Sequence, residues 1–392
     1  MIKGKEGIAL IMAIFFIVAL SILLTAVLML NNQEIRATQL QLDSNKAFYY
    51  AEAGVEYAQA SILNAEFEGN LDSNFLSMLS SSKTDDDLKN SFNDNSIKSV
   101  DLTVVPGSSD HTYAMTCEVT YNRATRKITK EIRILYPGLW DKAMASDKDI
   151  DLSINPSGNQ NQAGRIIITG DIHSNSNINY DVSDRVTVNG NITATGEING
   201  VPNNAPPLNI PIINLDVYKE LASSNRFSSG DDFINALNNN KLDTTSKPVY
   251  VYIKADKGGW DFKLENLRQE LIAYDICIIV DGDLFFNNTK SPITIGSDDY
   301  MITFIVTGKM DFTNIRNTTT FKNTLLYSQT QIDFNNLPGE VIVEGAMYSK
   351  DGYLGLSNIK NTLEITHKDW TYAQVSYLFD LYQVERWSDA GV

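Results

Sequence analysis

The sequence predicts an α+β protein in which one long N-terminal helix precedes a much larger β-rich part. Two observations carry this prediction. The chain has no charged residue over residues 8–30 and no Pro or Gly over residues 8–53. After residue 137, short apolar stretches that each contain one Gly recur along the chain. With 392 residues the chain is too long for one ordinary domain, so we expect two or three units.

The first expected element is a membrane-spanning helix over residues 8–30. This run is long enough to cross a bilayer core of about 30 Å, and its polar residues, Ser21 and Thr25, can hydrogen bond back to the helix. A secretory signal is usually shorter and ends at a cleavage site of small residues. Lys3 and Lys5 precede the run, which favours a cytoplasmic N-terminus and a body outside the membrane.

The helix is expected to continue beyond the membrane. Apolar residues recur at steps of one, three and four, which places them on one stripe of an α-helix. They are Ala47, Phe48, Ala51, Val55, Ala58 and Ile62. We therefore predict one helix over residues 8–66, apolar all round in its first half and amphipathic in its second. Such a helix suits a protein that leaves the membrane and packs beside copies of its own kind.

The leader ending in Gly7, the apolar helix and the stretch KAFYYAEAGVEYAQA together resemble the type IV pilins and type II secretion pseudopilins, and among them the PilX-like minor subunits. The resemblance covers residues 1–65. It implies a class III signal peptide over residues 1–7, which a prepilin peptidase would cut between Gly7 and Ile8. The helix would be kept as the filament core. The helix signature of the PilX N-terminal region matches Ala51, Glu52, Ala53 and Gly54.

One position departs from the major subunits of that family. Major pilins carry Glu at the fifth mature position, paired with a neighbour's N-terminal amine, whereas this chain has Met12 there. Because a buried ion needs its partner, a subunit without this carboxylate suits an end of the filament. The resemblance implies a minor, tip-type pilin or pseudopilin whose partners are other pilin subunits, the prepilin peptidase and the pilus assembly membrane proteins. A signal anchor that is never cleaved is the alternative.

Residues 67–137 are predicted to form a small antiparallel meander after a polar loop or short helix. Apolar residues alternate at 100–104, 113–121 and 128–136, with short turns between the runs, as in half-buried strands. A long helix laid on this meander would make a pilin-like domain. Lys130 interrupts the third apolar set. The run of Asp at 85–87 lacks the spacing of a calcium loop, so we expect a solvated surface charge.

Residues 138–392 are predicted to form a β-solenoid, favoured over a β-sandwich, with a helical insertion at about 201–275. The phrase apolar-x-apolar-x-Gly-x-apolar recurs at intervals of about 20 residues, as in stacked coils. A Gly inside a strand marks a bend or a close backbone approach. A further copy has Ser328 in place of Gly, and the aromatic stretch at 369–387 is expected to cap the stack. The repeat glycines are Gly170, Gly190, Gly282, Gly308 and Gly345.

No catalytic residue, metal site or cofactor is predicted, and we do not expect an enzyme. The three His residues stand in separate contexts, and the chain has no HExxH, GxSxG or phosphate-binding loop motif. Acidic residues near the repeat phrase could in principle pair as the acid and base of a glycan-cleaving enzyme. We expect Asp171, Asp283 and Asp311 to be outward polar residues of half-buried strands instead.

The net charge restricts the possible partners of the protein, and its cysteine content restricts the possible disulfides. The net charge of −16 argues against nucleic acid or an anionic membrane surface as a partner. Cys117 and Cys277 are far apart and belong to no metal motif, so two separate buried thiols are favoured over a disulfide. A single-pass membrane protein exposed on the pilus or cell surface is expected. Two other functions stay open: an anchored extracellular adhesin or glycan-binding module, and an anchored glycan-active enzyme. The ligand, a surface glycan or a host receptor, is not defined.

Overall fold

The computed structural model describes residues 3–107, 109–154, 164–181, 184–263, 273–288, 290–335, 337–356, 359–370 and 372–391. The chain forms two compact units. The first consists of Met1–Ile62, Asp72–Arg133 and Val384–Val392, and the second of Leu63–Leu71 and Ile134–Gln383. The large β-rich part predicted from the sequence belongs to the second unit.

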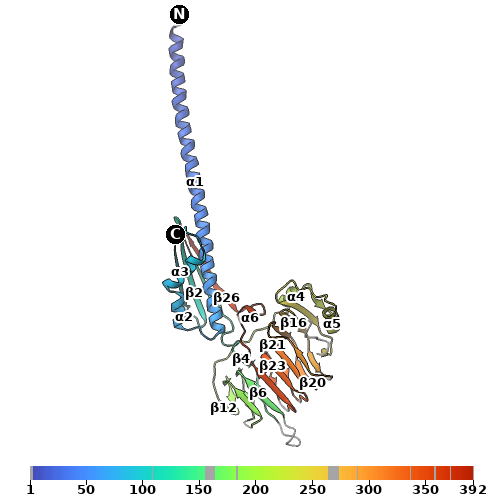
Figure 1. Ribbon diagram of the computed structural model, residues 1–392. Helices are drawn as coiled ribbons and strands as arrows, with labels where there is room; N and C mark the ends of the chain where they lie inside the picture. The colour runs from blue at the N-terminus through green and yellow to red at the C-terminus, as the bar shows by residue number, and fades with distance from the viewer. Residues whose placement is uncertain are drawn as a thin grey trace. The chain divides into compact units, whose positions relative to one another are not determined.

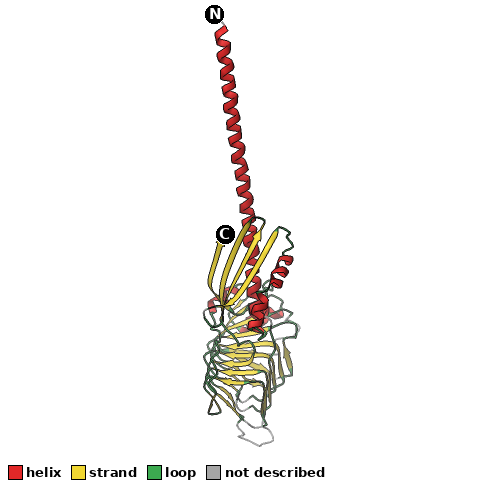
Figure 2. Cartoon of the chain, turned by 90° about the vertical axis from the view of Figure 1, so that its left-hand side faces the viewer, coloured by secondary structure: helices red, strands yellow, loops and turns green. Residues whose placement is uncertain are grey.

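The first unit is built on one long helix, α1, and a four-stranded sheet (Figures 1 and 2). The sheet has the order β1-β2-β3-β26, and β2 pairs antiparallel with both β1 and β3. The polar stretch before the sheet forms two short helices. The elements are α1 (Lys3–Phe67), α2 (Ser73–Leu79), α3 (Ser82–Ser91), β1 (Ile97–Pro106), β2 (Thr112–Tyr121), β3 (Ala124–Ile134) and β26 (Tyr382–Gly391).

The second part of α1 packs on this sheet through the predicted apolar stripe. Ala47, Ala51, Val55, Ala58 and Ile62 are at most 1% exposed. The alternation expected in the strands is also seen in their burial, since every second residue of β2 and β3 faces inward over most of each strand. Small side chains on the stripe let the helix axis approach the sheet closely.

Lys130, which interrupts the apolar set of β3, lies in the inward row and is 8% exposed. Its ammonium group is 2.7 Å from a carboxylate oxygen of Glu56 on α1. A buried charge is tolerated when an opposite charge faces it. The break in the apolar pattern therefore marks an ion pair between the sheet and the helix.

The fourth strand of the sheet was not predicted. We expected residues 369–387 to cap the β-rich body, but α6 (Tyr372–Val375) is the one helix among the described residues there, and β26 pairs with β3. The guanidinium of Arg133 is 3.1 Å from Glu385, and that of Arg126 is 3.5 Å from Asp389. An unpaired edge of β3 would leave backbone N–H and C=O groups open, and β26 satisfies them. The predicted domain of residues 138–392 therefore includes a strand that belongs to the first unit.

The second unit consists of short strands that pair mainly in parallel. Its strands and helices are β4 (Lys142–Ser146), β5 (Ile150–Leu152), β6 (Arg165–Thr169), β7 (Asp171–Ser174), β8 (Ile178–Tyr180), β9 (Val186–Asn189), β10 (Ile192–Ala194), β11 (Glu197–Ile198), β12 (Val201–Pro202), α4 (Leu215–Leu221), β13 (Arg226–Phe227), α5 (Gly230–Asn238), β14 (Val249–Lys254), β15 (Trp260–Lys263), β16 (Ile276–Asp281), β17 (Leu284–Asn288), β18 (Ile293–Ile295), β19 (Ile302–Val306), β20 (Met310–Ile315), β21 (Thr319–Ser328), β22 (Ile332–Asp333), β23 (Val341–Ser349), β24 (Leu354–Gly355), β25 (Thr362–Thr366) and α6.

Successive turns of the chain stack on one another in register. The strands β16, β17 and β18 pair in parallel with β19, β20 and the start of β21, respectively. Two sheets result, with the orders β10-β7-β4-β23-β21-β19-β16-β14-β13 and β12-β11-β8-β5-β24-β22-β20-β17-β15, and β18, β25, β6 and β9 add to the first. Side chains between the strands fill an apolar interior. Phe286, Phe312 and Phe334 stack there, with ring centroids 4.5 and 4.1 Å apart.

The chain enters this stack in its middle. Strand β4 lies between β7 and β23, and Met144 of β4 pairs with Met347 of β23. The predicted insertion at 201–275 is therefore only partly right. Helices α4 and α5 do lie between β12 and β14, but β14 and β15 are members of the two sheets. The part of the predicted insertion at residues 264–272 lies outside the described residues.

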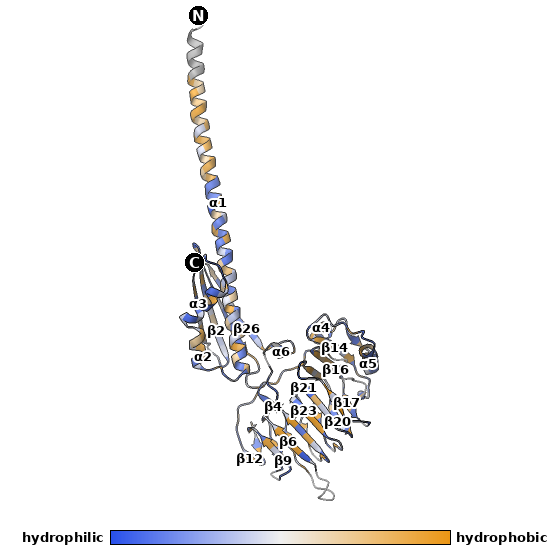
Figure 3. Cartoon of the chain, viewed as in Figure 1, coloured by the Kyte–Doolittle hydropathy of each residue, from blue (hydrophilic) through white to orange (hydrophobic). Residues whose placement is uncertain are grey.

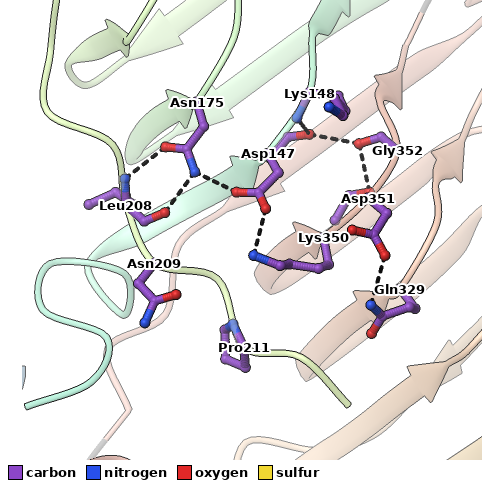
Figure 4. Close-up of polar contacts among 12 residues, drawn as sticks. Asp147, Lys148, Asn175, Leu208, Asn209, Pro211, Gln329, Lys350, Asp351 and Gly352 are labelled. Atoms are coloured by element: carbon purple, nitrogen blue, oxygen red, sulfur yellow. Dashed lines mark hydrogen bonds and ion pairs between the residues drawn. The ribbon is translucent and has the colours of Figure 1, made fainter.

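The irregular segment between β12 and α4 is held in place by side-chain hydrogen bonds (Figure 4). The side-chain amide of Asn175 accepts from the N–H of Leu208 at 2.7 Å and donates to its carbonyl at 2.7 Å. The same amide donates to Asp147, whose carboxylate is 2.6 Å from the ammonium of Lys350. One Asn thus replaces a strand neighbour for an irregular segment, which satisfies backbone groups that would otherwise be unpaired.

The predicted repeat glycines fall on two corners of the stack. At one, Gly308 donates its N–H to the carbonyl of Gly282 at 2.9 Å. Gly282 has φ +131°, which disfavours any side chain. At the other corner Gly190 lies against Gly170. A Cβ added to Gly170 would be 2.6 Å from the Cβ of His367. Glu344 pairs with Thr366, so the residues that follow them, Gly345 and His367, take equivalent places in this second row. His367 thus stands where the other turns of this row have a glycine.

Ser328 does not stand in for a repeat glycine, so that part of the prediction is wrong. It pairs with Val306 and Ser349, two residues before the position of Gly308. It belongs instead to a row of fully buried serines whose hydroxyl groups each donate to a carbonyl of the chain. These are Ser146, Ser174, Ser328 and Ser349.

Candidate functional site: the exposed apolar helix

The first part of α1 consists mostly of hydrophobic residues (Figure 3), and its apolar side chains are exposed on all sides. It is the one helix, among the residues described, that is long and apolar enough to span a membrane, and none of its most apolar segment is buried. Side chains more than half exposed there are Ile11, Met12, Ile14, Phe15, Phe16, Ile17, Val18, Leu20, Ile22, Leu23, Leu24, Val27, Leu28, Met29 and Leu30. A surface of this kind needs lipid or protein around it.

The two polar residues of this segment do not interrupt it. The hydroxyl of Ser21 donates to the carbonyl of Ile17, and that of Thr25 to the carbonyl of Ser21, each at 2.8 Å. The predicted bonds back to the helix are therefore present. Both hydroxyl groups are satisfied within the helix, as an apolar surrounding requires.

The predicted processing residues lie in the same helix. Gly7 and Ile8 fall within the backbone of α1, while their side chains lie outside the described residues. Met12 is 59% exposed. The cleavage between Gly7 and Ile8 stays a prediction, since the fold of the uncut chain does not test it.

The helix signature lies where α1 meets the sheet. Ala51 and Gly54 are buried, Glu52 is half-buried and Ala53 is exposed. A Cβ at Gly54 would be only 2.5 Å from the Sγ of Cys117 on β2. The buried half of the signature therefore lets the helix and sheet approach to a distance that excludes even a methyl group at Gly54.

On the N-terminal side of the helix signature, polar contacts connect α1 to the end of β2 and to the loop before β1. The ammonium of Lys46 donates to the hydroxyl of Tyr121 at 2.7 Å, and the hydroxyl of Tyr50 donates to Asp94 at 3.0 Å. The bond to Tyr121 raises the pKa of Lys46. The backbone N–H of Ser96 holds the pKa of Asp94 below its ordinary value. Both groups are thus stabilised in their charged forms.

The acidic residues near the repeat phrase are not brought together. Asp171 accepts from the N–H of Asn191 at 2.7 Å, and Asp283 accepts from the N–H of Lys309 at 2.8 Å. Asp311 lies in β20, 2.8 Å from the ammonium of Lys309. In the described part of the chain, no group of three or more His, Cys, Asp or Glu is placed to hold a metal ion. The carboxylates of Asp171 and Asp283 thus connect neighbouring turns of the stack, whereas Asp311 bonds within its own turn.

Sequence reasoning missed one buried charge on the helix. Asp43 is 6% exposed and precedes Ala47 by four residues, so it extends the buried stripe. The periodic pattern already contained this signal, because residues four apart share a helix face. The predicted stripe contained apolar residues only, whereas the buried face of the helix also includes this carboxylate.

The two cysteines allow a direct test of the packing. Both Cys117 and Cys277 are free and buried, and burial raises the pKa of the Cys117 thiol to about 12. Because the thiolate is the reactive form, we expect the folded full-length chain to incorporate no iodoacetamide at mildly alkaline pH and both thiols to react in concentrated urea. Mass spectrometry of the labelled peptides gives the count. The variant Ser109→Cys, at an exposed position, is the positive control, and rapid labelling of native Cys117 would contradict the packing of α1 on β2.

Neither a protein-family model nor a curated protein matches the sequence. Among solved structures, the chain is similar to the competence-associated pilin ComZ from Thermus thermophilus, with 12% identity, coverage of 89% of this chain and 98% of that one, and a TM-score of 0.27. It is also similar to an ice-binding protein from an Antarctic Biological Consortium (14% identity, coverage of 58% and 87%, TM-score 0.20) and to one from Antarctomyces psychrotrophicus (12%, 58% and 96%, TM-score 0.20). All three TM-scores are below 0.5, so these likenesses define neither fold nor function.

Proposed function

We propose that the protein is a minor, tip-type pilin or pseudopilin of a type IV pilus or a related filament. The observation that carries this proposal is the division of α1. Its first part exposes apolar side chains all round, and its second part is held to a sheet by a stripe of small residues. A helix of this form can rest in a bilayer and later exchange lipid for the helices of neighbouring subunits.

The proposal includes the cleavage of residues 1–7 by a prepilin peptidase and a cytoplasmic N-terminus before assembly. It assigns the partners as other pilin subunits and the membrane proteins of pilus assembly. The second unit, with its turns of parallel strands in register, would be a β-solenoid body displayed outside the cell. Its role would be to initiate assembly or to contact a surface. No catalytic role is assigned to any residue, and no cofactor is invoked.

The experiment that tests the proposal is a mass measurement of the N-terminal peptide after coexpression with a prepilin peptidase. We expect the mature chain to begin at Ile8 and the variant Gly7→Ala to keep Met1. The matched control is Gly4→Ala, which changes another leader glycine and should be processed like the wild type. An intact Met1 in every sample would reject processing and leave a permanent membrane anchor.

The position in the filament is tested at Met12. A carboxylate at this position could neutralise the N-terminal amine of a neighbouring subunit, which Met12 cannot do. In the host, we expect Met12→Glu to move the immunogold-labelled subunit from filament ends to positions along the shaft. Met12→Gln has nearly the same size without the charge and should stay at the ends. Labelling along the whole shaft in the wild type would contradict the tip assignment.

One observation favours a second candidate, an anchored adhesin or glycan-binding module. Outward residues at one end of the second sheet are polar and lie in register, as the exposed Lys263 and the half-buried Asn287 do on β15 and β17. The two candidates differ in what is lost with Gly7→Ala. A pilin variant would no longer enter the filament, whereas an anchored adhesin would keep its surface location and its binding to a glycan array.

A further inference from the structure

A pocket of about 560 Å³ opens in the first unit, beside the part of α1 that follows the apolar segment. One wall is a single face of the helix, formed by Arg36, Gln39, Leu40 and Asp43, whose spacing of three, four and seven residues aligns them. The other wall comes from the sheet. It consists of Lys98 of β1 and of Asn122 and Arg123 in the turn between β2 and β3.

The pocket gathers positive charge in a protein whose net charge is −16. Arg36, Lys98 and Arg123 are exposed, and no carboxylate of the described residues lies within ion-pair distance of them. Asp43 offsets one of the three charges. Its carboxylate is already bound to amides, since it accepts from Asn122 at 3.1 Å and from Gln39 at 3.3 Å. An excess of two positive charges therefore faces the pocket.

The position of the pocket along α1 determines how far it lies from the membrane. With a rise of 1.5 Å per residue, Arg36 lies about 9 Å beyond Leu30, where the apolar segment ends, and Asp43 lies about 20 Å beyond it. The headgroup layer of a bilayer extends about 5–8 Å on each side of its apolar core. The long side chain of Arg36 covers the remaining distance between this residue and the headgroups. Glu34, also exposed, is the one acidic group between Leu30 and Arg36.

We propose that this pocket binds the phosphate of an anionic phospholipid from the leaflet that surrounds α1. Arginine presents paired N–H donors that match phosphate oxygens, and lysine adds a compact charge. Leu40 offers an apolar contact for the glycerol end of the lipid. The proposal rests on the membrane stage of the proposed function and is independent of filament assembly.

The experiment measures which lipids the full-length chain retains. The chain is reconstituted in nanodiscs that contain equal amounts of phosphatidylglycerol and phosphatidylcholine, transferred to detergent, and its bound lipids are counted by mass spectrometry. We expect the wild type to retain phosphatidylglycerol at least tenfold over phosphatidylcholine. The triple variant Arg36→Gln, Lys98→Gln, Arg123→Gln should approach equal retention, because each cation near an anionic headgroup contributes about fivefold.

A matched control removes three exposed cations elsewhere, in Lys83→Gln, Lys127→Gln, Lys241→Gln, and should keep the wild-type preference. An equal loss in this control, or no preference in the wild type, would overturn the proposal. Complete displacement of phosphatidylglycerol by inorganic phosphate would make it a site for free phosphate instead. Unchanged lipid retention with altered cross-linking between copies would make it a protein interface. Failure of the wild type to enter nanodiscs would reject the membrane stage itself, which separates the two proposals.

Discussion

Replacing Gly345 by Val is expected to unfold the second unit at room temperature or to lower its free energy of unfolding by at least ~4 kcal/mol. Gly345 pairs with Thr324 in the neighbouring turn of the stack. A Cβ at Gly345 would overlap the carbonyl oxygen of Thr324. The obstacle is backbone, so no rotamer change can relieve it, and the turns must separate with loss of their parallel hydrogen bonds.

The measurement is urea unfolding followed by far-ultraviolet circular dichroism. The control is Gly258→Val, since no atom lies within 4 Å of a Cβ placed there. A surface change of this kind is expected to alter stability by no more than about 0.5 kcal/mol. If Gly345→Val unfolded at the same urea concentration as Gly258→Val, the close approach of β21 and β23 would be wrong.

Replacing Gly54 by Ala is expected to destabilise the contact between α1 and β2 by about 1–3 kcal/mol, because the new methyl group meets the Sγ of Cys117. In a Cys117→Ala background the sulfur is gone. There the same change should be neutral or stabilising by up to about 1 kcal/mol, since Ala favours the helix over Gly by that amount. The sign of the effect therefore depends on one sulfur atom.

Hydrogen exchange of the amides of β2 in the full-length chain measures this effect as the free energy of local opening. The four proteins form a double-mutant cycle, and we expect a coupling of at least ~1 kcal/mol. Ala53→Ser, at the exposed neighbouring position, should leave the exchange unchanged. A destabilisation by Gly54→Ala that persists without the sulfur would place its cause in the helix backbone rather than in the contact.

Local patterns predicted the first unit well. The helix could be predicted because its apolar stripe repeats every three or four residues, and the strands because apolar residues alternate. The ion pair between Lys130 and Glu56 could not be predicted, since it depends on which helix turn faces β3. Strand β26 was missed for a similar reason. Its partner lies about 250 residues earlier in the sequence, and such pairing overrides a local helix preference.

The second unit shows where a repeated phrase is ambiguous. The phrases around Gly170 and Gly282 look alike, yet they end strands on different sides of the stack, because each turn of chain contains more than one apolar strand before a bend. The phrase predicts bends and close contacts but not which bends align. Strands β14 and β16 are buried except at their last residue, and β19 is buried throughout, because residues such as Tyr218 and Trp370 cover their outer side. The nearly continuous apolar runs of these strands were the signal for this burial in the sequence.

Strand β26 also has a consequence for protein synthesis. It completes a sheet begun by β1, β2 and β3, but the ribosome makes it only after the whole of residues 134–383. A chain that stops early leaves the edge of β3 open, and an open edge attracts aggregation and degradation. The unit that carries the helix is therefore finished only when the body has been translated, so a truncated product lacks a complete first unit.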